Sequence, residues 1–191
     1  MNTAWSRVAL WAVLGAVVGT SLDALHVLTG TLVYATTELG LQPWWVPPEF
    51  ALAGVALGEG HRFLARTLGH HLPAASTAEV LRACAGLLLT YGASGFLKGL
   101  PHVALVLFVG GFVALLAATP TQARKTLAIH AAGTALCGPL VEATLCALGL
   151  FQYREAASPL VLGVPVWLPG IYLHAALATA ALDRALPRGA Q

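Results

Sequence analysis

Three ionisable residues, Asp23, His26 and Glu142, lie inside apolar stretches of this chain. A charged side chain at the centre of a bilayer costs about 2.5–3.5 kcal/mol on insertion scales, so each of these residues needs a partner or a function. Asp23 and His26 are three residues apart, on one helix face and close enough to pair. Such a pair could be a satisfied structural contact, a proton relay or a site for a polar headgroup.

Glu142 is the deepest of the acids, and its helix face also carries Gly138 and Cys146. Its surroundings are therefore small side chains rather than bulky ones. A carboxyl in such a place is protonated or paired, because a lone buried charge is too costly. We expect either a neutral glutamic acid that donates to a lipid hydroxyl or ester, or a hydrogen bond to another helix.

The remaining histidines, serines and cysteines form no recognisable catalytic or metal-binding pattern. No two histidines are spaced four apart within an apolar stretch, and His-Glu-x-x-His and Gly-x-Ser-x-Gly are both absent. Cys84, Cys137 and Cys146 lie in apolar runs without Cys-x-x-Cys spacing, so we expect them to be reduced. The sequence predicts no metal, no cofactor and no catalytic residues.

Six apolar stretches must position these side chains. The 191-residue chain is 58% hydrophobic and only 9% charged, against about 25% charged in soluble domains. A membrane-spanning helix needs about 20 apolar residues, and no connection is long enough for a soluble domain. We predict an all-α, polytopic membrane protein with a single domain over residues 1–191. Its six transmembrane helices are expected at about 8–34, 47–66, 78–96, 101–118, 124–150 and 166–186.

The basic residues lie mainly on alternate connections, which predicts the orientation. One side holds eight of them and the other holds only Lys98 and Arg154. By the positive-inside rule, both termini are cytoplasmic. The net charge of +2 is spread over the membrane edges and indicates no nucleic-acid partner. The eight basic residues are Arg7, Arg62, Arg66, Arg82, Arg124, Lys125, Arg184 and Arg188.

Tryptophans and small residues predict where a ligand would enter. Trp44 and Trp45 precede the second helix, and Trp167 precedes the sixth on the same side. Tryptophan is enriched at membrane interfaces, so we expect these three rings to form an aromatic rim. Small residues along the third and fifth helices predict an apolar cleft open sideways to the bilayer. At the other side, Ser76 and Glu79 have the spacing of a capping box at the start of the third helix.

Three short segments carry a family resemblance: Trp44-Trp45-Val46-Pro47-Pro48, Phe151-Gln152-Tyr153 and Trp167-Leu168-Pro169. In this order and spacing they resemble the insulin-induced gene (Insig) family of six-helix membrane proteins. The segment Tyr91-Gly92-Ala93-Ser94 is similar to the family's small polar segment at the end of the third helix. The resemblance covers roughly residues 44–186.

The resemblance implies a function that depends on lipids. Eukaryotic members lie in the endoplasmic reticulum, bind oxysterols and retain a sterol-sensing escort protein. Prokaryotic relatives share the fold, accept diacylglycerol in a cavity among the helices and can assemble as trimers. The stretch 121–125 lacks the acid that engages the escort protein, and helix 101–118 lacks the glutamine and paired tryptophans of the sterol site. We therefore expect no escort partner, and a bacterial inner membrane rather than the endoplasmic reticulum.

We expect an Insig-like, non-enzymatic protein that accepts a diacylglycerol- or sterol-like lipid between its helices, as a homo-oligomer such as a trimer. Two alternatives remain: a small proton-coupled transporter, or an intramembrane enzyme on lipids or isoprenoids that also uses His174. A transporter is expected to show an internal repeat that relates helices one to three to helices four to six, and the sequence shows none between these halves. The predicted lipid-binding residues are Asp23, His26, Trp45, Tyr91, Glu142 and Trp167.

Overall fold

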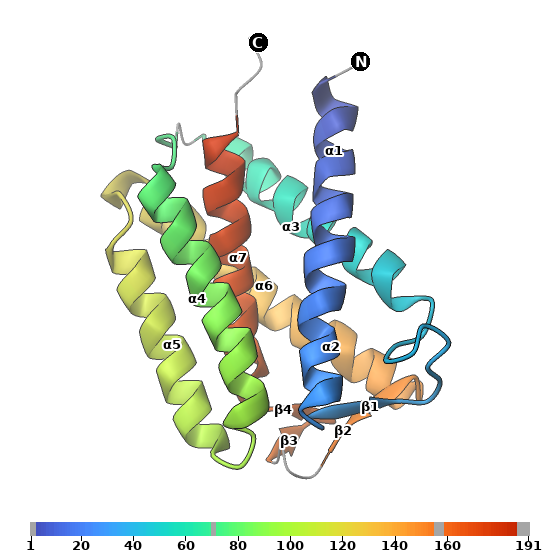
Figure 1. Cartoon of the computed structure of the whole chain (residues 1–191). Coiled ribbons are helices and arrows are strands. Elements are labelled where there is room, and N and C mark those ends of the chain that lie inside the picture. Colours follow the sequence, from blue (N-terminus) through green and yellow to red (C-terminus); the bar gives the residue numbers. More distant parts are fainter. Residues whose placement is uncertain (1–2, 70–71, 155–158, 187–191) are drawn as a thin grey trace.

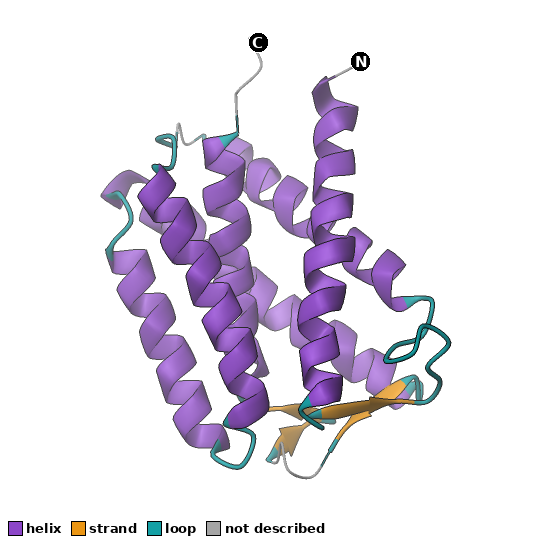
Figure 2. Ribbon diagram, viewed as in Figure 1, coloured by secondary structure: helices purple, strands orange, loops and turns teal. Residues whose placement is uncertain are grey.

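The structure is a computed structural model that describes residues 3–69, 72–154 and 159–186. It is a bundle of helices with short strands gathered at one end (Figures 1 and 2). The first helix begins and the last helix ends at the opposite end, which we call the terminal end. The helical segments are α1 (Thr3–Leu14), η1 (Gly15–Gly19), α2 (Thr20–Leu28), α3 (Val46–Thr67), α4 (Thr77–Phe96), α5 (Pro101–Ala117), α6 (Thr121–Ala147) and α7 (Leu168–Ala185).

The helix starts follow from local sequence. Pro47, Pro101 and Pro169 each lie in a first turn, where the missing N–H is not needed. Ser76 caps α4 and accepts a hydrogen bond from the Glu79 backbone N–H at 3.2 Å. This is half of the capping box expected from the sequence, because the Glu79 side chain turns to another partner described below.

Residues 32–34 differ from the expected first helix, which was predicted to run to residue 34. The helix ends earlier because Gly30 adopts a left-handed conformation with a φ of 65°. The chain then forms a strand that pairs with the segment after α6, so the predicted all-helical fold also carries short strands. The strands are β1 (Leu32–Tyr34), β2 (Phe151–Tyr153), β3 (Leu160–Val161) and β4 (Val164–Pro165).

Close helix packing depends on glycine at the crossing of the first helix and α3. A Cβ on Gly15 would lie 2.1 Å from the Phe50 carbonyl oxygen, and one on Gly54 would lie 2.4 Å from the Trp11 carbonyl oxygen. The two backbones are therefore in direct contact, as in membrane helix pairs with small residues.

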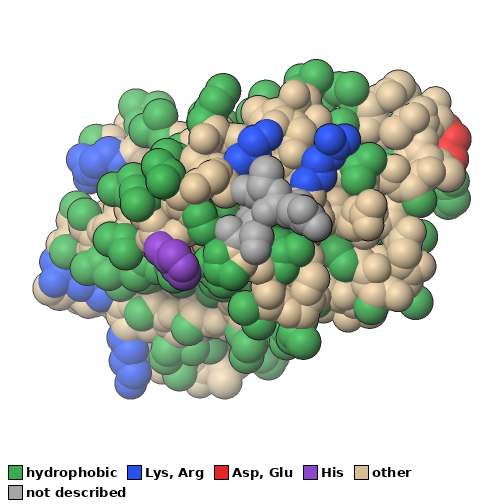
Figure 3. Space-filling model, turned by 90° about the horizontal axis from the view of Figure 1, so that it is seen from below, with side chains coloured by type: hydrophobic (Ala, Val, Ile, Leu, Met, Phe, Trp, Pro, Cys, Tyr) green, Lys and Arg blue, Asp and Glu red, His purple; other side chains and the backbone are tan. Residues whose placement is uncertain are grey.

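The outer surface is strongly apolar. Leu52, Leu89 and Val106 are each at least 70% exposed. By length and hydropathy, the segments Trp5–Leu28 and Thr121–Ala147 could each cross a bilayer, and α5 is apolar but shorter. Seen from the strand end (Figure 3), hydrophobic side chains spread over much of the face. Phe96, at the end of α4, is 82% exposed. Such a surface fits a membrane protein.

Candidate functional site

Asp23 is the first of two acids near the strands that accept hydrogen bonds from tyrosine hydroxyls, and it is 5% exposed. Its Oδ2 accepts hydrogen bonds from the Tyr34 hydroxyl and the Gln42 amide, each at 2.6 Å. Gln42 also donates to the Thr20 carbonyl at 3.1 Å. The expected contact between Asp23 and His26 is therefore wrong, because both side chains have other partners.

His26 instead connects α2 to α4. Its Nε2 lies 2.6 Å from the Ser94 hydroxyl, which itself donates to the Tyr91 carbonyl at 2.7 Å. The Ser94 oxygen is thus free to accept, and the imidazole donates to it. The imidazole stacks on the Tyr91 ring at 4.4 Å and meets the Trp167 ring edge-on at 5.8 Å. These contacts make His26 a structural link between two helices.

Glu142 is the second acid, and it is half-buried. Its Oε1 accepts a hydrogen bond from the Tyr172 hydroxyl at 2.6 Å, and its Oε2 accepts one from Tyr153. Gly138 makes this arrangement possible, because a Cβ there would lie 2.2 Å from the Tyr172 ring. One carboxyl is therefore held by two phenols, in a residue that is half-buried.

The strand tyrosines bring the two acids into one electrostatic cluster. Burial raises the pKa of Tyr34, and the nearby Asp23, Tyr91 and Glu142 raise that pKa further. Burial likewise raises the pKa of Tyr153 well above its usual value, and Glu142 and Tyr91 add to the effect. Both phenols therefore keep their protons and act as donors. Because Glu142 and Tyr91 affect the pKa of both Tyr34 and Tyr153, these four side chains lie in one region at the strand end.

The structure gathers most of the predicted residues here, with one correction. Trp45 is half-buried and packs edge-on against Tyr34, with 5.6 Å between the ring centres. Trp167 is fully buried and contacts the Tyr153 and His26 rings, so it does not join a surface rim with the 66% exposed Trp44. The donors to these two acids were not predicted from the sequence; they are Tyr34, Gln42, Tyr153 and Tyr172.

His174 forms its hydrogen bond outside the group of residues around Asp23 and Glu142. Its Nε2 donates to the Phe108 carbonyl oxygen at 2.9 Å, which links α7 to α5. Among the residues that the structure describes, no group of three or more His, Cys, Asp or Glu side chains could hold a metal ion.

The two acids occupy matching places in a pattern that occurs twice. The pattern is glycine, three residues, an acid, six residues, glycine, three residues and tyrosine. In both copies the second glycine has a positive φ, 65° at Gly30 and 74° at Gly149, and ends the helix. In both copies the tyrosine donates to the acid eleven residues before it. The first copy is Gly19, Asp23, Gly30 and Tyr34, and the second is Gly138, Glu142, Gly149 and Tyr153.

The pattern continues into the following helix. Trp45-Val46-Pro47 opens α3, and Trp167-Leu168-Pro169 opens α7. Three residues after each first-turn proline stands an aromatic residue, Phe50 or Tyr172. Each of these rings lies over the first glycine of its own copy: a Cβ on Gly19 would be 2.4 Å from Phe50, and one on Gly138 would be 2.2 Å from Tyr172. The helix–strand–helix unit is therefore duplicated in structure as well as in sequence.

The strand register relates the two units by a local two-fold axis. β1 and β2 are antiparallel, with Val33 opposite Gln152 in the middle and Tyr34 and Tyr153 at the two ends. Val33 and Gln152 are equivalent positions, so the axis passes through that pair. The repeat relates the first two predicted helices, 8–34 and 47–66, to the last two, 124–150 and 166–186. It does not relate the first three predicted helices to the last three.

Comparison with known proteins comes from solved structures, because no protein-family model and no curated protein matches this chain. The chain is similar to MvINS, a mycobacterial Insig homologue from Mycobacterium vanbaalenii, with a TM-score of 0.78 and 26% sequence identity. The match covers 96% of this chain and 95% of that one. A cross-linked trimer of a cysteine variant of MvINS matches with a TM-score of 0.76 at the same identity and coverage.

Proposed function

We propose that this prokaryotic Insig-like membrane protein binds a diacylglycerol- or sterol-like lipid at the strand-end acids. The bundle spans a bacterial inner membrane six times with both termini cytoplasmic, and assembles as a homo-oligomer such as the trimer formed by MvINS. The observation that carries the lipid proposal is Glu142, a half-buried carboxyl held by two phenols. An acid within an apolar helix that is held in a fixed orientation suits recognition of a neutral polar headgroup.

The chemistry of the site favours a ligand that both donates and accepts. Each oxygen of Glu142 accepts one phenol hydrogen bond and retains a lone pair for a lipid hydroxyl. Tyr91 lies in the same cluster and makes no side-chain hydrogen bond through its hydroxyl to the described residues, so it can donate to an ester carbonyl. Diacylglycerol offers one hydroxyl and two esters, which fits this pair. Asp23 lies deeper and fixes Tyr34, while Trp45 and Trp167 supply apolar contact.

The test is lipid retention by purified protein, measured by native mass spectrometry and by extraction of bound lipid. Replacing Glu142 with Gln or Leu removes a charge-assisted hydrogen bond of about 1.5–3 kcal/mol, so retention should fall by about tenfold or more. The matched control is Glu59→Gln, which alters an acid paired with Arg7 at the terminal end and should leave retention unchanged. Full retention in folded Glu142 variants would remove this carboxyl from the site.

The duplicated unit favours a second candidate, a proton-coupled carrier. Parallel repeats related by an axis along the membrane normal occur in transporters, and here each repeat supplies one acid. A carrier would move a radiolabelled lipid or solute across proteoliposomes faster under a pH gradient. Loss of that movement in both Asp23→Asn and Glu142→Gln would support this candidate over static binding.

A further inference from the structure

A different pair of buried charges lies at the terminal end, where α4 begins and α7 ends. Glu79 is 6% exposed and Arg184 is 3% exposed, and the Arg184 Nη2 donates to Glu79. The Nη1 of Arg184 donates to the Pro73 carbonyl at 3.3 Å. Its Nε–H is buried and has no hydrogen-bond partner within residues 3–69, 72–154 and 159–186. The guanidinium therefore has one unused donor, which is costly unless a ligand or water accepts it.

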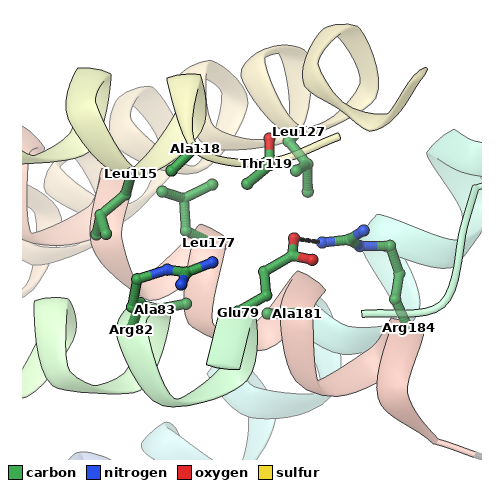
Figure 4. Close-up of a pocket in the computed structure, with 10 residues that line it drawn as sticks. All are labelled: Glu79, Arg82, Ala83, Leu115, Ala118, Thr119, Leu127, Leu177, Ala181 and Arg184. Atoms are coloured by element: carbon green, nitrogen blue, oxygen red, sulfur yellow. Dashed lines mark hydrogen bonds and ion pairs between the residues drawn. The ribbon is translucent and has the colours of Figure 1, made fainter. Parts of the chain in front are cut away.

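Glu79 and Arg184 line a small hollow that is partly open to the surroundings. Figure 4 shows the Arg82 guanidinium turned toward the same opening. Arg82 is exposed and forms no ion pair with the part of the chain that the structure describes. The other walls are mainly apolar and include Leu115 and Leu177. The hollow is thus lined by the unpaired cation of Arg82, by Arg184 with its unused buried N–H, and by apolar side chains.

The charge of the hollow selects for one class of ligand. Glu79 cancels the charge of Arg184, so the three side chains together carry one positive charge, that of Arg82. A phosphodiester carries one negative charge, and its oxygens match the fork of N–H donors on a guanidinium. The apolar walls can contact the glycerol and upper acyl chains next to that phosphate. At the end of the bundle, such a site lies at the level of phospholipid headgroups.

We propose that the hollow between Glu79, Arg82 and Arg184 binds the phosphodiester of an anionic phospholipid. Arg82 supplies both the charge and the N–H donors to the phosphate oxygens, and the buried Glu79–Arg184 pair forms the floor of the site. This site lies at the opposite end of the bundle from the strand-end acids, so it is independent of the lipid proposed there.

The experiment uses full-length protein in detergent, with dioleoyl phosphatidylglycerol, dioleoyl phosphatidylcholine or sodium phosphate added. Native mass spectrometry counts bound lipid, and the melting temperature reports stabilisation. We expect phosphatidylglycerol to bind, and Arg82→Gln to weaken that binding by about tenfold, as for loss of one charge-assisted contact. The matched control is Arg66→Gln, which removes an exposed charge at the same end but outside the hollow.

Each result decides the matter. Loss of phosphatidylglycerol in Arg82→Gln with retention in Arg66→Gln supports the site. Equal loss in both variants means general charge attraction and overturns it, as does absence of binding to the unaltered protein. Equal binding of phosphatidylcholine overturns the selectivity for an anionic lipid. Stabilisation by sodium phosphate to the same extent would mean that the hollow takes a free anion rather than a lipid. Because Arg82 is exposed, its variant should keep the unaltered melting temperature without lipid.

Discussion

The two copies of the duplicated unit hold their acids in different ways. Asp23 is 5% exposed, and its second donor is the loop amide of Gln42. Glu142 is half-buried, and its second donor is Tyr172 on the next helix. At the place equivalent to Tyr172, the first copy has Phe50, which offers no hydroxyl. One scaffold thus holds a buried acid bonded to a loop amide and a half-buried acid bonded to a second phenol.

The largest effect should come from adding a side chain at the two glycines that lie against aromatic rings, which we call the notch glycines. Gly19→Ala and Gly138→Ala each place a Cβ within 2.4 Å of an aromatic ring, and overpacking costs about 1–3 kcal/mol. Both variants should melt at lower temperature. Only Gly138→Ala should also lower lipid retention, because it moves Tyr172 away from Glu142. The control is Gly133→Ala, also on α6, where a Cβ meets nothing within 4 Å. Equal retention by both notch variants would argue against different roles for the copies.

Removing one phenol from each copy should have a smaller effect. Tyr34→Phe and Tyr153→Phe each delete one hydrogen bond to a carboxyl and leave the other donor in place. We expect each to destabilise the protein by about 1–2 kcal/mol, measured by thermal unfolding in detergent. Lipid retention should fall in Tyr153→Phe and persist in Tyr34→Phe. The reverse order would mean that Asp23 is the acid that contacts the ligand.

The smallest effect should come from making the first copy resemble the second. Phe50→Tyr adds a hydroxyl at the position equivalent to Tyr172, within the unit that contains Asp23. If it reaches the carboxyl, it should stabilise the protein by up to about 1 kcal/mol, seen as a raised melting temperature. The gain should disappear in an Asp23→Asn background. A loss of stability in both backgrounds would show that the equivalence stops at the backbone.

Much of the helical framework could be predicted from sequence because it depends on local signals. Apolar length marked the helices, Pro47, Pro101 and Pro169 marked three starts, and Ser76 marked a fourth. The resemblance to the Insig family rested on short sequence segments rich in tryptophan and proline, and the similarity to MvINS supports it. Six membrane spans and their orientation remain predictions from apolar length and basic residues.

The partners of the buried acids could not be predicted, since they depend on tertiary contacts. Asp23 was expected to meet His26 because helical spacing was the only geometry available, but Tyr34 reaches it after a chain reversal at Gly30. Trp167 was placed at a rim because nothing in the sequence distinguishes a buried indole from an interfacial one. The repeated glycine–acid–glycine–tyrosine spacing was visible, and comparison of the first unit with the last would have found Tyr34 and Tyr153.

The separation along the chain between each acid and its partner sets an order for biosynthesis. Asp23 and Glu142 each receive a phenol from eleven residues downstream, so the nascent segment that carries the acid soon brings its own donor. Glu79 must wait for Arg184, 105 residues later, at the end of the last helix. Until α7 has been made, Glu79 lacks the partner that it has in the folded bundle. A chain truncated before α7 would therefore leave Glu79 of α4 without this partner.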